Sequence, residues 1–254
     1  GDLRTDDAGS ALVLDPAAMR RLAASVASDD RALLERTAER IRAFAQRQRE
    51  ALTSIETTVP GGRAGHLIAP MEAAGCYAPG GRYPLPSSVL MTAVTARVAG
   101  VRTVVVASPR PAPITAAAAM VAGADLMLTI GGAQAVAAMA YGVSVPRCDI
   151  IVGPGNRWVT AAKKIVQGDA AIDMLAGPSE LLVLADDTAE ASWIAADLLA
   201  QAEHDTDAVP TLVTTSARLA DDVESELERQ LASLPTGATA RAALANGCCV
   251  VCES

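Results

Sequence analysis

Apolar and polar residues divide the chain into a helical start and a longer part in which strands and helices alternate. From about residue 15 to residue 54, apolar residues recur at helical spacing and charged residues occupy the other faces. Asp15-Pro16 is a typical helix start, because an acid can cap the first turn and proline fits its first position. The sequence SDD around Asp29 can divide this stretch into two helices. Residues 1–14 are predicted to be irregular, and VPGG at 59–62 predicts a turn.

From about residue 75, short apolar runs alternate with helical segments about twice as long. The runs typical of strands lie at 103–108, 125–130, 149–153, 181–186, 211–215 and 248–253, and a predicted helix follows each of them except the last. This alternation is typical of βαβ units, whose strands form a parallel sheet. We therefore predict an α/β fold with two Rossmann-like parallel-sheet modules and an N-terminal helical segment.

The two predicted modules comprise residues 75–177 and 178–254 and are joined near the sequence AGPSE. Residues 1–74 form the helical segment, which has no sheet of its own to cover. We expect it to pack on the second module, because a helix buries its apolar face against another element.

Composition narrows the class of protein. Apolar residues make up 51% of the 254 residues, which indicates a globular domain, and aromatic residues only 2%, so the core must consist of aliphatic side chains. The net charge of −8, without a basic run, argues against binding to nucleic acid or to an anionic membrane surface. No apolar stretch reaches about 18 residues and no signal-peptide pattern opens the chain, so we expect a cytoplasmic protein.

Five cysteines, without a signal peptide, indicate reduced thiols. Cys249 and Cys252 form a C-x-x-C pair, but the pair lies in a predicted strand and would be half a zinc site at best. We interpret the cysteines as small buried apolar residues.

Two glycine loops follow predicted strands and open onto helices. They are Gly131-Gly132-Ala133-Gln134 and Gly153-Pro154-Gly155-Asn156. Glycine lets a ligand approach the backbone, and a helix N-terminus offers N–H groups. Either loop alone could be an ordinary turn with a capping side chain, and neither matches the usual dinucleotide fingerprint. Two such loops on neighbouring strands nevertheless favour a nucleotide-like ligand.

A third loop, residues 76–89, contains two of the three tyrosines, Tyr77 and Tyr83. Such a ring could stack on a base. Alternatively, Tyr77 simply packs in a strand, and the spacing does not decide between the two.

Gln201 and His204 are three residues apart near the end of a predicted helix, so they share one face. Imidazole is a common metal ligand, whereas an amide oxygen is a rarer one. Alternatively, a lone histidine at a helix C-terminus interacts with the helix dipole and has no further role. The only other histidine, His66, lies far away in a turn-like region. We expect Glu203 and Asp205 to be solvated.

Five motifs in this order and at these separations resemble those of histidinol dehydrogenase, a zinc enzyme that oxidises histidinol to histidine with NAD. They are YAPGG, IGGAQA, VGPGN, IDMLAGPSE and LLAQAEHD, and the resemblance extends from about Thr58 to the end of the chain. It implies that module 75–177 binds NAD through Tyr77, Gln134 and Asn156. It also implies that Gln201 and His204 are zinc ligands that contact the substrate, an amino alcohol, and that Ser179 contacts the substrate too. The full-length family member is expected to be a homodimer.

The chain departs from the family at its C-terminal side. The resemblance places the catalytic base, a Glu-His pair, beyond Ser254, and the remaining zinc ligands, an Asp and a second His, further on. No catalytic residue is therefore assigned in this chain, which we expect to be an inactive partial enzyme. Two alternatives stay open: a related alcohol dehydrogenase, such as one acting on sulfopropanediol, and a non-catalytic nucleotide-binding remnant. We also expect the uncovered strand at 248–253 to promote aggregation.

Overall fold

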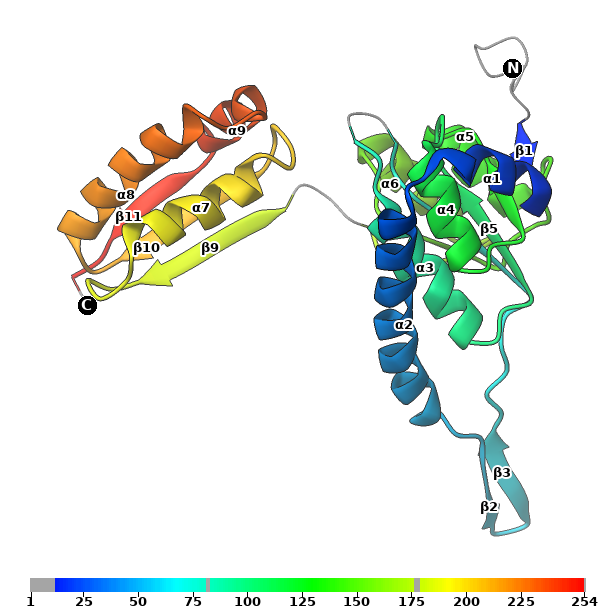
Figure 1. Ribbon diagram of the computed structural model, residues 1–254. Helices are drawn as coiled ribbons and strands as arrows, with labels where there is room; N and C mark the ends of the chain where they lie inside the picture. The colour runs from blue at the N-terminus through cyan, green and yellow to red at the C-terminus, as the bar shows by residue number, and fades with distance from the viewer. Residues whose placement is uncertain (1–11, 81–82, 176–178, 254) are drawn as a thin grey trace. The chain divides into compact units, whose positions relative to one another are not determined.

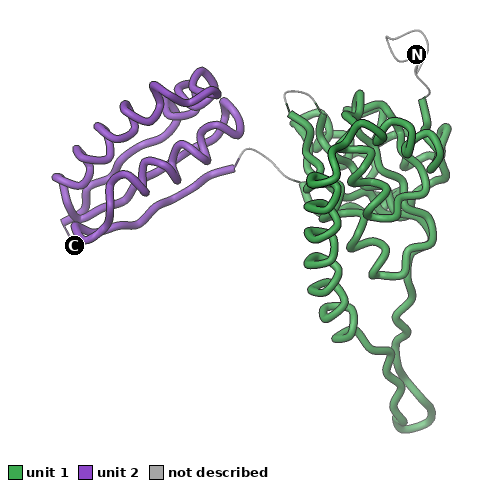
Figure 2. Tube along the Cα trace, viewed as in Figure 1, with its two compact units in different colours: residues 1–176 green, residues 177–254 purple. Residues whose placement is uncertain are grey.

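The computed structural model describes residues 12–80, 83–175 and 179–253. These residues form two compact units, which comprise residues 1–176 and 177–254 (Figure 2). The division falls beside the predicted boundary at residues 177 and 178. The prediction for residues 1–11 lies outside the described residues, as do Gly81 of the YAPGG motif and residues 176–178 of the AGPSE motif.

The N-terminal helices begin and divide where the sequence predicts. Helix α1 (Pro16–Leu22) begins after Asp15, whose carboxylate oxygen accepts a hydrogen bond from the Ala18 amide at 2.7 Å. A short 3-10 turn, η1 (Ala23–Ser25), separates it from α2 (Ser28–Glu50). The predicted break near Asp29 is therefore confirmed.

The first unit is built on a six-stranded sheet with the order β1-β6-β5-β4-β7-β8. Its strands are β1 (Val13–Leu14), β4 (Ala73–Tyr77), β5 (Thr103–Ala107), β6 (Leu126–Leu128), β7 (Ile150–Val152) and β8 (Ala171–Ile172). All neighbouring strands are parallel except β1, which pairs with β6 in the antiparallel direction. The parallel sheet predicted from the alternation is confirmed, and β1 and β8 are short additions that were not predicted.

Helices cover both faces of this sheet (Figure 1). On one face, Val104 and Val106 pack in a core with α3 (Pro86–Val98) and α4 (Pro113–Val121). On the other face, Val105 packs in a second core with α5 (Gly132–Tyr141) and α6 (Arg157–Val166). Such double cover is typical of a parallel sheet, and it explains the apolar runs in its strands.

The prediction that residues 1–74 pack on the second module is wrong. Met19 of α1 and Leu34 and Ala38 of α2 are buried in the same core as α3 and α4, within the first unit. The physical reason lies in α4, whose four consecutive alanines 116–119 are fully buried. A helix that is apolar all round needs neighbours on its outer side as well as a sheet on its inner side, and α1 and α2 supply that outer layer.

Residues 55–66 form a hairpin that the sequence pattern did not predict. Its strands β2 (Ile55–Val59) and β3 (Gly62–His66) are antiparallel and exposed along their whole length. The predicted turn is confirmed at its tip, where Gly61 has a φ of +86°. Strand β3 lacks alternating apolar residues, so no strand signal was present. His66 lies in this strand, and its Nε2 is 3.1 Å from the Thr53 carbonyl oxygen.

The second unit is a three-stranded parallel sheet with the order β11-β10-β9. Its strands are β9 (Glu180–Ala185), β10 (Val209–Thr214) and β11 (Cys248–Val251), and its helices are α7 (Ala191–Ala202), α8 (Ala217–Leu231) and α9 (Gly237–Leu244). All three helices lie on one side of the sheet (Figure 1). The second predicted module is therefore confirmed as a parallel α/β unit.

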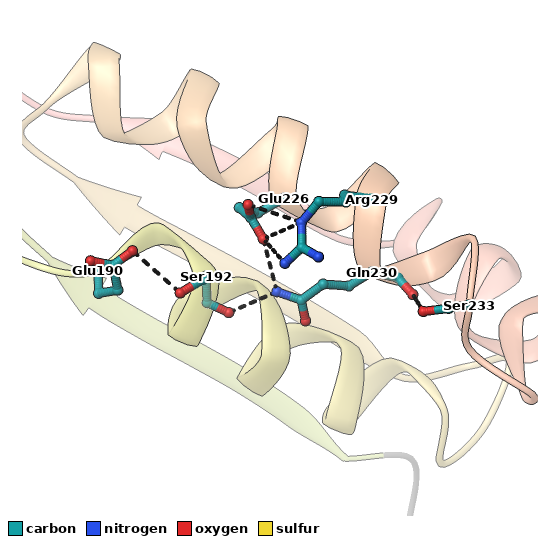
Figure 3. A network of polar contacts seen from close by, with 6 residues as sticks. All are labelled: Glu190, Ser192, Glu226, Arg229, Gln230 and Ser233. Carbon is teal, nitrogen blue, oxygen red and sulfur yellow. Dashed lines mark hydrogen bonds and ion pairs between the residues drawn. The ribbon is translucent and has the colours of Figure 1, made fainter.

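A polar network joins two of these helices (Figure 3). The Gln230 side chain on α8 donates one hydrogen bond to the Ser192 carbonyl on α7 at 2.8 Å and another to Glu226 at 3.2 Å. Arg229 forms an ion pair with the same Glu226 at 2.6 Å. The hydrogen bond from Gln230 to Ser192 thus links α8 to α7 beside the apolar cluster that the two helices share.

No helix among the described residues is long and apolar enough to cross a membrane.

Candidate functional site

The carboxyl ends of four parallel strands meet at one edge of the first sheet. Tyr77 at the end of β4 pairs with Ala107 at the end of β5, which pairs with Leu128 at the end of β6. On the other side of β4, Cys76 pairs with Val152 at the end of β7. Ligands of open parallel sheets bind beyond this kind of edge. The three predicted cofactor residues lie here: Tyr77, Gln134 and Asn156.

Tyr77 lies in the middle of this edge and contacts both glycine loops. Its hydroxyl oxygen accepts a hydrogen bond from the Gly132 amide at 3.0 Å. Its backbone carbonyl lies so close to Gly153 that a side chain on Gly153 would approach it to 2.0 Å. Tyr77 is only 4% exposed and packs in the core. Of the two interpretations, the structure therefore agrees with packing in the strand, because a buried ring has no open face on which a base could stack. Tyr83 is the exposed tyrosine of the pair, at 60%.

The loop before α5 leaves its helix N-terminus without a side-chain cap. Gly131 is the N-cap residue and no capping hydrogen bond is made from its position, so the Tyr77 hydroxyl bonded to the Gly132 amide is the side chain that meets this first turn. Gly132 has a φ of +67°, which favours glycine. The exposed Gln134 side chain lies above this turn, since an atom added at Gly132 would be 3.0 Å from its amide oxygen. The open N–H groups and the neighbouring amide together suit an anionic group.

The loop before α6 is capped, in contrast. The Asn156 side-chain oxygen accepts hydrogen bonds from the amides of Trp158 at 3.1 Å and Val159 at 3.2 Å. The Asn156 oxygen therefore caps α6, as in the alternative interpretation of this loop as an ordinary turn with a capping side chain. Gly153 has a φ of +116°, and its lack of a side chain allows the loop to pass against Tyr77.

The structure contains an ion pair beside this loop that was not predicted from the sequence. The Lys163 ammonium group, on α6, binds the Asp173 carboxylate and the Gly153 carbonyl oxygen, the latter at 3.1 Å. Asp173 in turn accepts a hydrogen bond from the Gly153 amide at 2.8 Å. Lys163 is 2% exposed and shares the apolar face of α6 with Val159 and Val166. A lysine on the apolar face of a helix was the signal that could have revealed this pair.

Hydrogen bonding sets the charge of Asp173. Burial by itself would raise the pKa of this carboxyl. Hydrogen bonds from Lys163 and from the Gly153 and Met174 amides outweigh that effect and hold the pKa below its ordinary value of 3.8. The carboxylate is therefore ionised at neutral pH and pairs with the lysine.

In the second unit, the structure brings the predicted substrate and metal residues into one neighbourhood. The Gln201 side-chain nitrogen donates a hydrogen bond to the Ser179 carbonyl at 3.1 Å. His204 lies just after α7, in a turn whose amide donates to the Gln201 carbonyl at 3.3 Å, and it is exposed. Helix α7 ends at Ala202, two residues before the histidine. Gln201 therefore lies in the helix and His204 in the turn after it, although a common helical face was predicted for the two.

Of the two acids that were predicted to be solvated near this site, one needs correction. Glu203 is half-buried and accepts a hydrogen bond from the Thr236 hydroxyl at 2.7 Å, so it is a structural contact rather than a solvated acid. Asp205 is exposed, as expected, and accepts a hydrogen bond from the Asp207 amide at 3.0 Å.

The cysteines differ in exposure, with two buried, two exposed and Cys252 half-buried. All five are free, in agreement with the prediction of reduced thiols. Cys76 and Cys148 are buried as expected, and burial raises the pKa of each thiol to about 12. Cys248 and Cys249 are exposed, so for these two the prediction of burial is wrong. The reason is that β11 is an edge strand with little covering it.

Within residues 12–80, 83–175 and 179–253, no group of three or more histidine, cysteine or acidic side chains could hold a metal ion. Gln201 and His204 are thus two ligand candidates without a complete set around them. The donor atoms still suit zinc, because the Gln201 nitrogen is engaged by Ser179 and its oxygen is left for a ligand.

Comparison with known proteins places these loops in a family. The family model described as histidinol dehydrogenase matches residues 3–254. The chain belongs to the histidinol dehydrogenase family. Histidinol dehydrogenase from Thermus thermophilus is 51% identical over 221 residues, which cover 86% of this chain and 53% of the relative. The enzyme from Methanosarcina mazei is 48% identical over 223 residues, which cover 85% of this chain and 52% of the relative.

The fold agrees with that of a solved member. The crystal structure of histidinol dehydrogenase from Elizabethkingia anophelis is similar with a TM-score of 0.86 and 34% identity, and the match covers 96% of this chain and 58% of that one. The chain therefore spans about half the length of the histidinol dehydrogenases that it matches. The family match begins at residue 3, so it includes the N-terminal helices as well as the motifs recognised after Thr58.

Proposed function

We propose that this chain forms the NAD-binding part, and one half of the zinc and substrate site, of an enzyme that oxidises L-histidinol to L-histidine. The observation that carries the proposal is the meeting of the Tyr77, Gly131–Gln134 and Gly153–Asn156 segments at the carboxyl edge of one parallel sheet. The family match supports histidinol as the substrate. The NAD itself is inferred from the loops' chemistry and from the resemblance of their motifs.

The loops divide the work of holding a dinucleotide. The uncapped N-terminus of α5 offers N–H groups to a phosphate, and Tyr77 holds those groups in place through the Gly132 amide. The exposed amide of Gln134 adds a donor and an acceptor beside them. The Asn156 oxygen is used by its own helix, so we propose that its side-chain nitrogen is the group that contacts the cofactor.

The proposed reaction removes two hydrides in succession. First, a C–H bond of the alcohol carbon breaks, its hydride passes to NAD⁺, and the hydroxyl proton leaves, which yields histidinal. The hydrated aldehyde then loses a second hydride to another NAD⁺ and another proton, which yields the carboxylic acid. Each proton requires a general base. The resemblance assigns that base to a Glu-His pair that these 254 residues do not include, so we propose that they alone do not turn over histidinol.

We propose that this chain supplies only part of the set of zinc ligands. Zinc, when bound, would hold the amino alcohol and orient its hydroxyl group. Gln201 and His204 supply two donor atoms, and Ser179 lies beside Gln201 to contact the substrate. Catalytic zinc sites use three protein ligands or more. Tight zinc binding is therefore proposed to require the family's Asp and second His.

Calorimetric titration of the 254-residue chain with NAD tests the proposal. We expect saturable binding that becomes about tenfold weaker in Gln134→Ala, because the variant loses one polar contact with a charged ligand. Gln46→Ala on α2 is the matched control, since it removes another exposed glutamine from a different part of the same unit. Absence of NAD binding by the unmodified chain, or equal binding by both variants, would contradict the proposed site.

The wider biology follows from the same proposal. We propose that the full-length protein is a cytoplasmic homodimer that acts in histidine biosynthesis and binds neither nucleic acid nor membranes. Sedimentation analysis of a full-length protein containing this chain would test the dimer.

A further inference from the structure

The Lys163–Asp173 ion pair forms hydrogen bonds with both backbone polar groups of Gly153. Lys163 binds the Gly153 carbonyl oxygen at 3.1 Å, and Asp173 accepts from the Gly153 amide at 2.8 Å. Lys163 and Asp173 also bind each other. One ion pair thus fixes both the amide and the carbonyl group of Gly153.

Gly153 is the residue at which the second glycine loop begins, and its conformation is unusual. Its φ of +116° is one that side chains disfavour, and Tyr77 stands against its α-carbon. The loop then leads in three residues to Asn156, which caps α6. The position of Gly153 therefore determines where Asn156 and the first turn of α6 lie.

The burial of this pair carries a cost that a purely structural role does not explain. The Lys163 side chain is 3% exposed and that of Asp173 is 33% exposed. Removing such charges from water carries a desolvation cost, and apolar residues of the same volume often stabilise a fold equally well or better. In some proteins buried charged groups instead serve to fix one specific geometry, and here both groups bind the Gly153 backbone.

We infer that Lys163 and Asp173 are positioning residues, which hold the Gly153–Asn156 loop in the geometry that receives the dinucleotide. This inference rests on the proposed function, since it names a second layer of residues behind that site. Neither residue contacts the cofactor in this account. Both act through Gly153 and, beyond it, through Asn156.

The test uses a double variant, Lys163→Met with Asp173→Asn. The double change removes both charges together, so it leaves no unpaired buried charge that would unfold the unit. Trp158, at the first turn of α6, reports on the loop by its fluorescence, because its ring is exposed and lies 5.3 Å from the Arg157 guanidinium carbon. The chain has one other tryptophan, so all variants are made with Trp193→Phe in the second unit.

A second ion pair provides a matched control. Arg97 binds Asp125 and also donates to the Gly123 carbonyl oxygen at 2.8 Å, so it too holds backbone in the first unit. It does so where β6 begins, at the end of the sheet opposite the loops. The control is Arg97→Met with Asp125→Asn.

We expect the Lys163/Asp173 variant to bind NAD at least about tenfold more weakly, the scale typical of lost supporting contacts around a site. We expect the control to bind NAD as the parent does, whatever its melting temperature. Equal weakening in both variants would show a general loss of stability and would overturn the inference, as would NAD binding within twofold of the parent by the Lys163/Asp173 variant.

Amide hydrogen exchange separates this inference from the proposed function. The Trp158 and Val159 amides, which donate to Asn156, are expected to exchange faster in the Lys163/Asp173 variant and unchanged in the control. If the parent binds no NAD, the proposed function is overturned in this chain, and the exchange rates still decide whether the pair holds the loop. Unchanged exchange at both amides would overturn the inference even if NAD binds.

Discussion

The two sheets of this protein are built from the same kind of strand but differ in their cover. In the first sheet, Val104, Val105 and Val106 are all fully buried, although successive residues of a strand face opposite sides. In the second sheet, Leu181 and Val183 pack under the helices, whereas Leu182 and Leu184 are 62% and 76% exposed. Parallel strands with apolar residues on both faces normally have cover on both faces.

The uncovered face of the second sheet extends across its strands. Register places Leu182 beside Thr211 and Cys248, and Leu184 beside Val213 and Val250. On the opposite, helix-covered side of the sheet, a mainly apolar groove of about 670 Å³ lies at the β11 edge between the strand and helices α8 and α9. Exposed apolar surface of this kind is where other protein packs or where chains associate. The strands of both sheets thus have apolar residues on both faces, but only the first sheet has helices of its own unit packed on both faces.

The largest difference between the two sheets is expected when a charge is placed in each. We expect Val105→Asp to prevent the first unit from folding, because an unpaired carboxylate would be buried at a position with no exposure. Leu184→Asp should leave folding intact, because its position is solvated. Circular dichroism and urea unfolding would measure both. Similar destabilisation by the two variants would show that the face containing Leu184 is in fact covered.

A smaller but still large effect is expected at the loop edge of the first sheet. Gly153→Ala would force a side chain against the Tyr77 carbonyl at 2.0 Å and into a disfavoured φ, so we expect a loss of about 2 kcal/mol or more. Gly168→Ala is the control, because nothing lies within 4 Å of the added atom. Urea unfolding of the two variants should separate them. An equal loss would mean that the loop moves freely.

Acid should weaken the first unit through Asp173. Its native pKa is lowered, so its stabilising contribution is complete above its ordinary value of 3.8 and is lost as pH falls toward the native value. We expect the Lys163→Met/Asp173→Asn variant to show a shallower loss of stability between about pH 5 and pH 2. In the second unit the pKa of Glu226 is also lowered, chiefly by the hydrogen bond from Arg229, whose own side chain is 66% exposed, so solvent screens this pair. Glu226→Gln should therefore change the acid profile less than the Lys163/Asp173 variant does, as thermal melts at several pH values would show.

The smallest effect on stability, and a clear one on association, is expected on the open face. Replacing Leu182 and Leu184 with lysine should reduce self-association of the chain and change the free energy of unfolding by less than about 1 kcal/mol. Light scattering against concentration would measure the association. Lysines at the exposed Leu67 and Met71 of the first unit are the control. If only the control reduces scattering, the open face is not the surface that associates.

Much of the fold was predictable because the information is local. Apolar runs, glycine stops and the Asp15-Pro16 cap predicted the long helices other than α3 and every strand of the two sheets except β1, β4 and β8. The partner of the N-terminal helices was not predictable, because packing depends on surface that only the assembled sheet presents. The β2–β3 hairpin was missed because its strands are exposed and carry no apolar alternation.

The candidate site shows the same division. The sequence alone was enough to predict candidate site loops, since glycine, amide and histidine residues follow the strands in a recognisable order. What those residues contact depends on the tertiary structure, in which the Tyr77 ring is buried, Asn156 caps its own helix, and Lys163 binds Asp173 and Gly153. Local spacing specifies elements and loop positions, whereas burial and hydrogen-bond partners depend on residues that are brought together from distant parts of the chain.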